Sequence, residues 1–114
     1  MDTQFEVRWR LRNNENIVGF ERHMGARVWS SADGLWWRGE RLLYKEKDRC
    51  LMARDVNNQW LFEGDVVTLR KDPSQWTLRH LPQEKWVLVR NEITMDAPIL
   101  DWQLKRVCFN FRLK

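Results

Sequence analysis

The sequence lacks a long apolar run, and it contains few residues that break regular structure. No stretch approaches the roughly 18 uncharged apolar residues that a membrane-spanning helix needs, so we expect no membrane partner. Glycine and proline together number 5 + 3 = 8 among 114 residues, which is too few for a linker or a low-complexity segment. Because this length suits one ordinary core, we predict a single domain over residues 1–114.

Cysteine and histidine are also scarce, which limits metal and nucleophile chemistry. Cys50, Cys108, His23 and His80 do not lie at the short spacings of zinc sites, and no glycine-rich phosphate loop or local nucleophile motif is present. We therefore predict a non-enzymatic protein with no catalytic residue, cofactor or metal, and with both cysteines reduced and buried. The start of the chain has no basic segment followed by an apolar one, which predicts a cytoplasmic location.

The sequence is rich in arginine and tryptophan. Arginine outnumbers lysine by 14 to 6, the net charge is +4, and tryptophan occurs eight times. Guanidinium groups bind phosphate or carboxylate through two parallel hydrogen bonds and also stack on aromatic rings. This composition favours either a nucleic-acid surface or a surface in which arginines cover tryptophans and pair with the chain's own carboxylates.

The hydrophobic pattern is that of β-strands. Apolar and polar side chains alternate over residues 5–12 and again over residues 106–113, which predicts a strand near each end of the chain. The other expected strands cover 17–22, 27–30, 35–39, 41–45, 49–54, 60–62, 66–70, 76–81 and 86–90. Asp33-Gly34 and Lys45–Asp48 are expected hairpin turns. We predict an all-β fold, a small, partly open SH3-like barrel with additional hairpins.

The strongest candidate site combines basic and aromatic residues. On the first strand, alternation places three arginines on one face, and Arg112 and Lys114 extend the basic character at the last strand. Two adjacent tryptophans must point to opposite faces, so we expect one of them to be partly exposed. The candidate binding residues are Arg8, Arg10, Arg12, Trp36, Trp37 and Arg112. Four other tryptophans, Trp9, Trp60, Trp76 and Trp86, lie in strand segments and are expected in the core.

A second candidate is the acidic pair that flanks a glycine. Glu63 and Asp65 are both expected on one side of the chain around Gly64. As a functional site, the pair would hold a divalent metal or act in acid–base catalysis in a hydrolase. As a structural feature, it would be a turn whose aspartate accepts hydrogen bonds from the following backbone amides. We favour the turn.

The segment around this pair resembles the signature of the YopX-like family of phage and prophage proteins. That signature reads lysine-aspartate-x-asparagine-glycine-x-x-isoleucine-tyrosine-glutamate-glycine-aspartate-isoleucine/valine-valine. The matching residues are Asp55, Asn57, Phe62, Glu63, Gly64, Asp65, Val66 and Val67. The departures are Arg54, Asn58 and Leu61. The resemblance implies a β-rich fold, a cytoplasmic location and an accessory role in a mobile element or bacterium, and it supplies no catalytic residue.

Together these patterns favour a binding or accessory protein that contacts nucleic acid through an Arg- and Trp-rich β surface. The alternative is a protein–protein adaptor or homo-oligomeric module, because Trp and Arg also dominate protein interfaces. A metal-dependent enzyme built on Glu63 and Asp65 is the third hypothesis.

Overall fold

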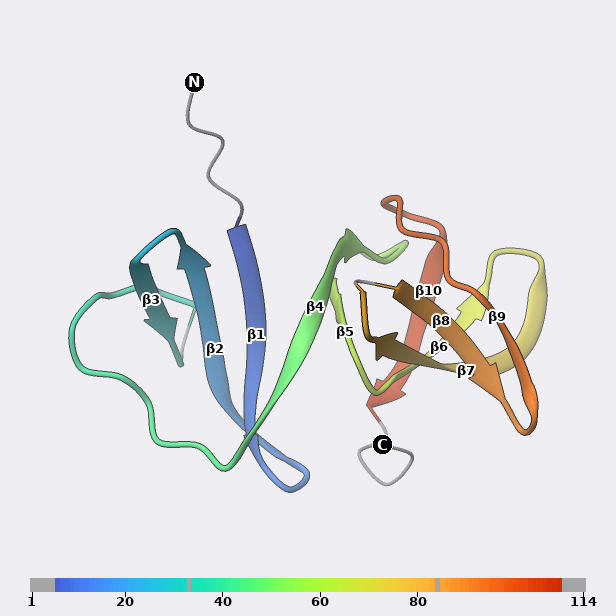
Figure 1. Ribbon diagram of the computed structural model, residues 1–114. Helices are drawn as coiled ribbons and strands as arrows, with labels where there is room; N and C mark the ends of the chain where they lie inside the picture. The colour runs from blue at the N-terminus through green and yellow to red at the C-terminus, as the bar shows by residue number, and fades with distance from the viewer. Residues whose placement is uncertain (1–5, 33, 84, 110–114) are drawn as a thin grey trace. The chain divides into compact units, whose positions relative to one another are not determined.

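The computed structural model describes residues 6–32, 34–83 and 85–109, and every regular element in these ranges is a β-strand (Figure 1). The all-β prediction is therefore confirmed. The strands are β1 (Glu6–Asn13), β2 (Asn16–Met24), β3 (Arg27–Ser31), β4 (Glu46–Arg54), β5 (Trp60–Phe62), β6 (Asp65–Leu69), β7 (Asp72–Leu81), β8 (Lys85–Arg90), β9 (Ile93–Asp96) and β10 (Leu104–Phe109). The described residues form no helix that could cross a membrane.

The chain divides into two compact units, residues 1–49 and 50–114. Strand β4 begins in the first unit and ends in the second. Among the described residues, neither sheet closes on itself. The single domain expected from the length stays a prediction, and the cooperativity of unfolding of the intact chain would test it.

In the first unit, the strands lie in the order β3-β2-β1-β4, and all neighbours are antiparallel. The β1–β2 turn uses Asn14 at φ 56°, and the β2–β3 turn uses Gly25 at φ 58°. Asparagine and glycine accept this left-handed conformation most readily, so the sequence sets both turns. Within β2, Gly19 leaves no room for a side chain, because a Cβ there would overlap the Ser31 carbonyl oxygen and the Leu42 side chain.

In the second unit, an antiparallel sheet has the order β10-β6-β7-β8-β9. The end of β4 pairs with β5 in the same unit. Alternate side chains of these strands form one hydrophobic core. It consists of Leu51, Ala53, Leu61, Val67, Trp76, Leu78, Leu88 and Leu104, with Leu69, Trp86 and Ala97 packed against it.

The middle of the first unit differs from the prediction. The expected strand at 35–39 is a single bridge between Ser30 and Trp37, and residues 41–45 are irregular. The turn expected at 45–48 is wrong, since β4 starts at Glu46. These charged residues form a strand because Asp48 opposes Arg10 of β1, which stabilises an acidic side chain inside a sheet. No residue pattern indicated β9, whose four residues are all exposed.

The predicted core tryptophans divide into two pairs. Trp76 is buried and Trp86 packs on the core of the second unit, as expected. Trp9 and Trp60 are half-buried and lie under cationic side chains instead.

Both cysteines are free, but only Cys50 is buried. The expectation of a buried Cys108 is wrong. Cys108 opposes Val66, and this register places it on the face of the sheet opposite to the core residue Val67.

Candidate functional site

One face of the first unit's sheet carries neighbouring arginine and tryptophan side chains. Opposed residues on antiparallel strands share a face, and Arg22 opposes both Arg8 and Trp29. These three side chains therefore lie side by side across β1, β2 and β3. Trp36 and Arg38, from the irregular segment after β3, contact the same side chains. We call Arg8, Arg22, Trp29, Trp36 and Arg38 the Arg–Trp row.

Every guanidinium of the Arg–Trp row lies over an indole ring. The Cζ atoms of Arg8 and Arg22 are 5.6 and 5.2 Å from the ring centroid of Trp36. The Cζ atoms of Arg22 and Arg38 are 5.6 and 5.5 Å from that of Trp29. A guanidinium within about 6 Å of an indole centroid is attracted to the electron-rich face of the ring. These contacts hold both indoles in fixed positions.

The Arg–Trp row has a net positive charge, and its two tryptophans are partly exposed to solvent. Glu6 forms ion pairs with the Nε atoms of Arg8 at 3.1 Å and Arg22 at 3.3 Å. Three arginines and this one glutamate leave 3 − 1 = 2 positive charges. Trp29 and Trp36 are half-buried, and Arg38 is exposed. The row therefore combines a net positive charge with indole rings that are partly exposed, which suits an anionic ligand with a planar group.

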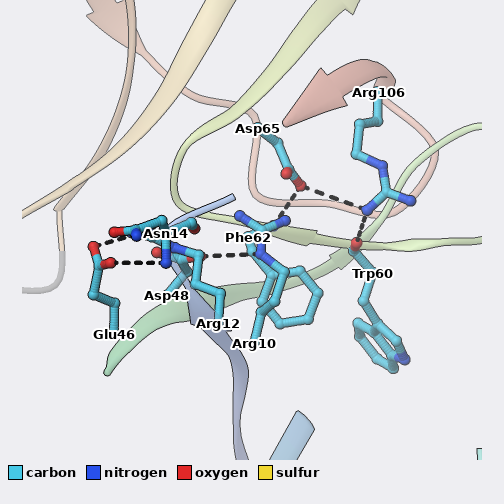
Figure 2. A network of polar contacts seen from close by, with 9 residues as sticks. All are labelled: Arg10, Arg12, Asn14, Glu46, Asp48, Trp60, Phe62, Asp65 and Arg106. Carbon is cyan, nitrogen blue, oxygen red and sulfur yellow. Dashed lines mark hydrogen bonds and ion pairs between the residues drawn. The ribbon is translucent and has the colours of Figure 1, made fainter. Parts of the chain in front are cut away.

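Arg10 and Arg12 share the face of Arg8, as predicted, but the expectation that they belong to a basic surface is wrong. Their side chains are buried, with 1% and 3% of their surface exposed. Both Nε atoms donate to Oδ2 of the fully buried Asp48, at 3.0 and 2.9 Å (Figure 2). Glu46 lies 2.9 Å from Nη1 of Arg12. Arg10, Arg12 and Asp48 form a buried ion cluster, and Glu46, whose side chain is 43% exposed, balances its charge from the surface.

This cluster is structural. Burial alone would lower the pKa of Arg12, but its hydrogen bonds and ion pairs with Asp48 and Glu46 outweigh burial and raise the pKa. The cluster also orders the β1–β2 turn, since Nη1 of Arg12 donates to the carbonyl oxygen of Asn14 at 2.9 Å. Charged groups this well paired are not available to a ligand.

The opposite face of the same sheet holds a buried carboxylate. Glu21 is fully buried and accepts hydrogen bonds from Arg41 at 2.8–3.0 Å, and it lies 3.0 Å from Nε2 of His23. Burial by itself would raise the pKa of Glu21, but the hydrogen bonds and charges of His23 and Arg41 together lower the pKa below its ordinary value of 4.5. On the same face, Trp9 lies under Lys47, whose Nζ is 4.3 Å from the ring centroid.

The lowered pKa of Glu21 predicts acid sensitivity. A carboxylate whose pKa is lower in the folded state contributes stability above its ordinary pKa and loses it as the pH falls through the folded pKa. The free energy of unfolding should therefore decline as the pH drops below about 4.5. Glu21→Gln should be less stable than the native chain near neutral pH, and the gap should narrow in acid. Urea denaturation over a pH series measures both. A gap that stays constant with pH would contradict this role.

Besides Arg10 and Arg12, the candidates Trp37 and Arg112 are not part of the Arg–Trp row. Trp37 bridges to Ser30 through backbone hydrogen bonds of 2.8 and 2.9 Å, and its Nε1 donates to the carbonyl oxygen of Glu40 at 2.8 Å. Trp37 thus binds the segment after β3 to the edge of the sheet. Its neighbour Trp36 belongs to the row. Arg112 and Lys114 lie outside the described residues.

Asp55, the first matching residue of the segment that resembles the YopX-like signature, binds backbone N–H groups from two parts of the chain, and we call these contacts the Asp55 clasp. Oδ1 of Asp55 accepts hydrogen bonds from the backbone N–H groups of Asn57 and Gln59, both at 2.9 Å, and Oδ2 accepts one from Arg106 at 3.1 Å. Asp55 is fully buried, so these bonds satisfy a desolvated carboxylate. Asn57 contributes its backbone N–H to this clasp, and its own side chain is exposed.

The acidic pair does not converge on one site. Oδ2 of Asp65 accepts a hydrogen bond from the backbone N–H of Phe62 at 2.9 Å and lies 3.8 Å from Nη1 of Arg106 (Figure 2). Oε2 of Glu63 instead accepts from the backbone N–H of His80 at 3.0 Å. Between them, Gly64 has φ 92° and donates to the carbonyl oxygen of Leu78.

These contacts support the favoured interpretation of a turn, although Asp65 binds a preceding amide rather than the following ones that we expected. The described residues contain no group of three or more His, Cys, Asp or Glu side chains placed to hold a metal ion.

No protein-family model, curated protein or solved structure matches this chain. Three residues of the Arg–Trp row, Arg22, Trp29 and Arg38, were not among the sequence candidates. The signal that could have found two of them is the hairpin turn at Gly25, since pairing outward from that turn brings Arg22 opposite Trp29.

Proposed function

We propose that this chain is a non-enzymatic accessory protein that binds single-stranded nucleic acid through the Arg–Trp row. The observation that carries this proposal is the stacking of Arg8 and Arg22 on the half-buried Trp36, with the exposed Arg38 beside Trp29. Aromatic faces next to cations are the common elements of surfaces that bind single strands without sequence preference.

The form of the row favours single strands over duplexes. Stacking of one unpaired base on an aromatic side chain is worth about 1–3 kcal/mol, while the bases of a duplex already stack on one another. The neighbouring guanidinium groups would bind the phosphates that flank a stacked base. We therefore expect tighter binding of single-stranded DNA or RNA than of duplex DNA.

Charge reversal in the Arg–Trp row should weaken this binding. Arg38→Glu should lower the affinity for a single-stranded oligonucleotide about tenfold or more. It should also reduce the slope of log affinity against log salt concentration, by about the amount that one phosphate contact contributes. Trp36→Leu should lower the affinity by an amount comparable to one lost base stack, about 1–3 kcal/mol. Fluorescence anisotropy at two salt concentrations measures both effects.

The matched control is Arg70→Glu, which changes the net charge equally at an exposed residue of the second unit. Arg10 and Arg12 are unsuited to this test, because their replacement would break the buried ion cluster. Equal losses from Arg38→Glu and Arg70→Glu would indicate a response to net charge alone and would count against the row. Circular dichroism confirms that each variant is folded.

A protein adaptor or a homo-oligomer is the second candidate, and the exposed edge strand β9 favours it. Ile93 and Met95 of β9 are 58% and 37% exposed. Trp102, in the loop that follows, is 53% exposed. Edge strands pair readily with strands of other chains. Light scattering separates the candidates, since a mass that rises with concentration supports self-association and a constant monomer mass does not.

We also propose that the second unit is a partly open SH3-like barrel and that the first unit supplies the additional hairpins. The supporting observation is its five-stranded antiparallel sheet, in which Gly64 makes the bend before β6. We propose a relationship to the YopX-like family from the residues that match its signature, which all lie in this unit. A phage-related role and a cytoplasmic location stay predictions.

A further inference from the structure

The two edge strands of the second unit's sheet, β10 and β9, differ in how their backbones are covered. In β10, the backbone N–H of Arg106 donates to Asp55 at 3.1 Å, and the carbonyl oxygen of Leu104 accepts from the N–H of Val56 at 2.9 Å. A register shift between Arg106 and Cys108 also makes β10 irregular. Covering loops and bulges are common means of keeping an edge strand from pairing with other chains.

The other edge strand, β9, differs in each of these respects. It pairs with β8 without a register shift, contains no proline, lysine or arginine, and consists of four exposed residues. Among the described residues, no strand pairs with its other side. This edge is therefore open to pairing with an additional strand.

The backbone geometry shows which groups of β9 would pair. Ala97, directly after the strand, donates its N–H to the carbonyl oxygen of Trp86 at 3.0 Å. Because successive residues of an antiparallel strand direct their backbone groups to alternate sides, Met95 also bonds toward β8. The N–H and C=O groups of Thr94 and Asp96 therefore point away from the sheet.

A row of core side chains ends at this open edge. Leu78 opposes Leu88, and Leu88 opposes Met95, so the row runs across β7, β8 and β9. Leu78 and Leu88 are fully buried, whereas Met95 is 37% exposed and Ile93, on the same face, is 58% exposed. A strand added beside β9 would cover these two side chains and continue the row.

We propose that β9 pairs with β9 of a second copy of this chain, antiparallel about a two-fold axis at Met95, so that the two sheets become one. On the core face, Met95 then meets its own counterpart, and Ile93 meets Ala97. On the other face, Thr94 meets Asp96, and these are the residues whose backbone groups point outward. The strand is thus complementary to itself, as an interface between two symmetric copies requires.

Charge favours this register. It places no two charged residues of the strands directly opposite each other, and Asp96 keeps its ion pair with Lys85 at 3.9 Å. Moving the axis to Thr94 would instead place Glu92 opposite Asp96 of the second copy. Directly opposed like charges destabilise a strand pair.

This inference rests on the second candidate function, self-association, and specifies its surface. It does not depend on the Arg–Trp row, because every residue involved belongs to the second unit.

Sedimentation equilibrium of the intact chain over a concentration series measures the dimer. Thr94→Pro removes one outward N–H from each copy and leaves the bonds between β8 and β9 in place. It should raise the dissociation constant of the dimer about 10- to 100-fold, since two hydrogen bonds are lost. Thr94→Ala keeps the N–H and should dimerise as the native chain does.

A charge at the axis tests the side-chain contact. Met95→Glu would bring two like charges together and should raise the dissociation constant at least as much as Thr94→Pro. The matched control is Val107→Glu, at a 47% exposed residue of the other edge strand, which should leave the dimer unchanged. Circular dichroism confirms that each variant is folded.

Disulfide cross-linking tests the register, with Cys108→Ser as the background because Cys108 is exposed. Residues that meet at a non-hydrogen-bonded position have Cα atoms about 4.5 Å apart, which suits a disulfide. Met95→Cys should therefore yield a covalent dimer on mild oxidation. Thr94→Cys should not, because the axis at Met95 places the two copies of this residue diagonally.

Three results would overturn the proposal. A constant monomer mass would overturn it together with the second candidate function. Self-association that folded Thr94→Pro and Met95→Glu leave unchanged would overturn the proposal alone. Cross-linking by Thr94→Cys instead of Met95→Cys would overturn the register, and this test still decides if Thr94→Pro does not fold.

Discussion

Asp48→Asn is expected to lower the free energy of unfolding by about 3–5 kcal/mol, because it leaves buried cations without their counter-charge. Arg10 and Arg12 are almost fully buried, and each donates its Nε–H to the same oxygen of Asp48. Asparagine keeps one acceptor oxygen at this position but removes the negative charge. Chemical denaturation followed by circular dichroism measures the loss.

A matched control is Asp96→Asn. Asp96 forms an exposed ion pair with Lys85 at 3.9 Å, with side-chain exposures of 87% and 62%, and an exposed pair of this kind contributes little stability. The double variant Arg10→Gln/Asp48→Asn measures the coupling between these two residues. Its loss should be smaller than the sum of the single losses, since coupled residues are not additive. Additive losses, or an Asp48→Asn variant as stable as Asp96→Asn, would contradict the cluster.

Asp55→Asn should cost about 2–4 kcal/mol, because one side chain satisfies three backbone N–H groups. Oδ1 accepts from Asn57 and Gln59, and Oδ2 accepts from Arg106. Asparagine has a single acceptor oxygen, and its NH₂ group would then face at least one backbone donor in a buried site. The clasp joins the 55–59 turn to β10, so its loss should loosen both segments. Urea denaturation and amide hydrogen exchange measure the change.

Asn57→Ala is the control from the same motif. The clasp uses only the backbone N–H of this residue, so its replacement should change stability by no more than about 0.5 kcal/mol. The acidic residues of the motif would have a chemical role instead if Asp55→Asn kept the native stability and lost binding of a divalent ion. Titration of both variants with Mg²⁺ distinguishes these outcomes.

Local chemistry made much of the fold predictable. The alternation over residues 5–12 correctly indicated β1. Predictions failed where a distant contact decides the conformation. The charged residues 46–48 read as a turn, yet they join a strand because Asp48 meets Arg10 and Arg12, which lie 38 and 36 positions away in the chain.

The candidate site was predictable in kind but only partly in its residues. Alternation correctly placed Arg8, Arg10 and Arg12 on one face, but periodicity gives no information about what covers that face. Two of these arginines, Arg10 and Arg12, are buried because both bind Asp48 of β4. The neighbours of Arg8 are Arg22, which the hairpin register places opposite it, and Trp36 from the segment after β3. The residue pattern along one strand gives no information about either contact.

The most direct test of the proposed function is a titration of labelled single-stranded DNA, duplex DNA and RNA with the intact protein at two salt concentrations, with tryptophan fluorescence recorded in the same samples. Binding through the Arg–Trp row predicts tighter binding of single strands than of duplex, quenching of tryptophan emission and weaker binding at the higher salt concentration. Absence of binding at low salt, or binding that leaves tryptophan emission unchanged, would contradict a nucleic-acid role for the row.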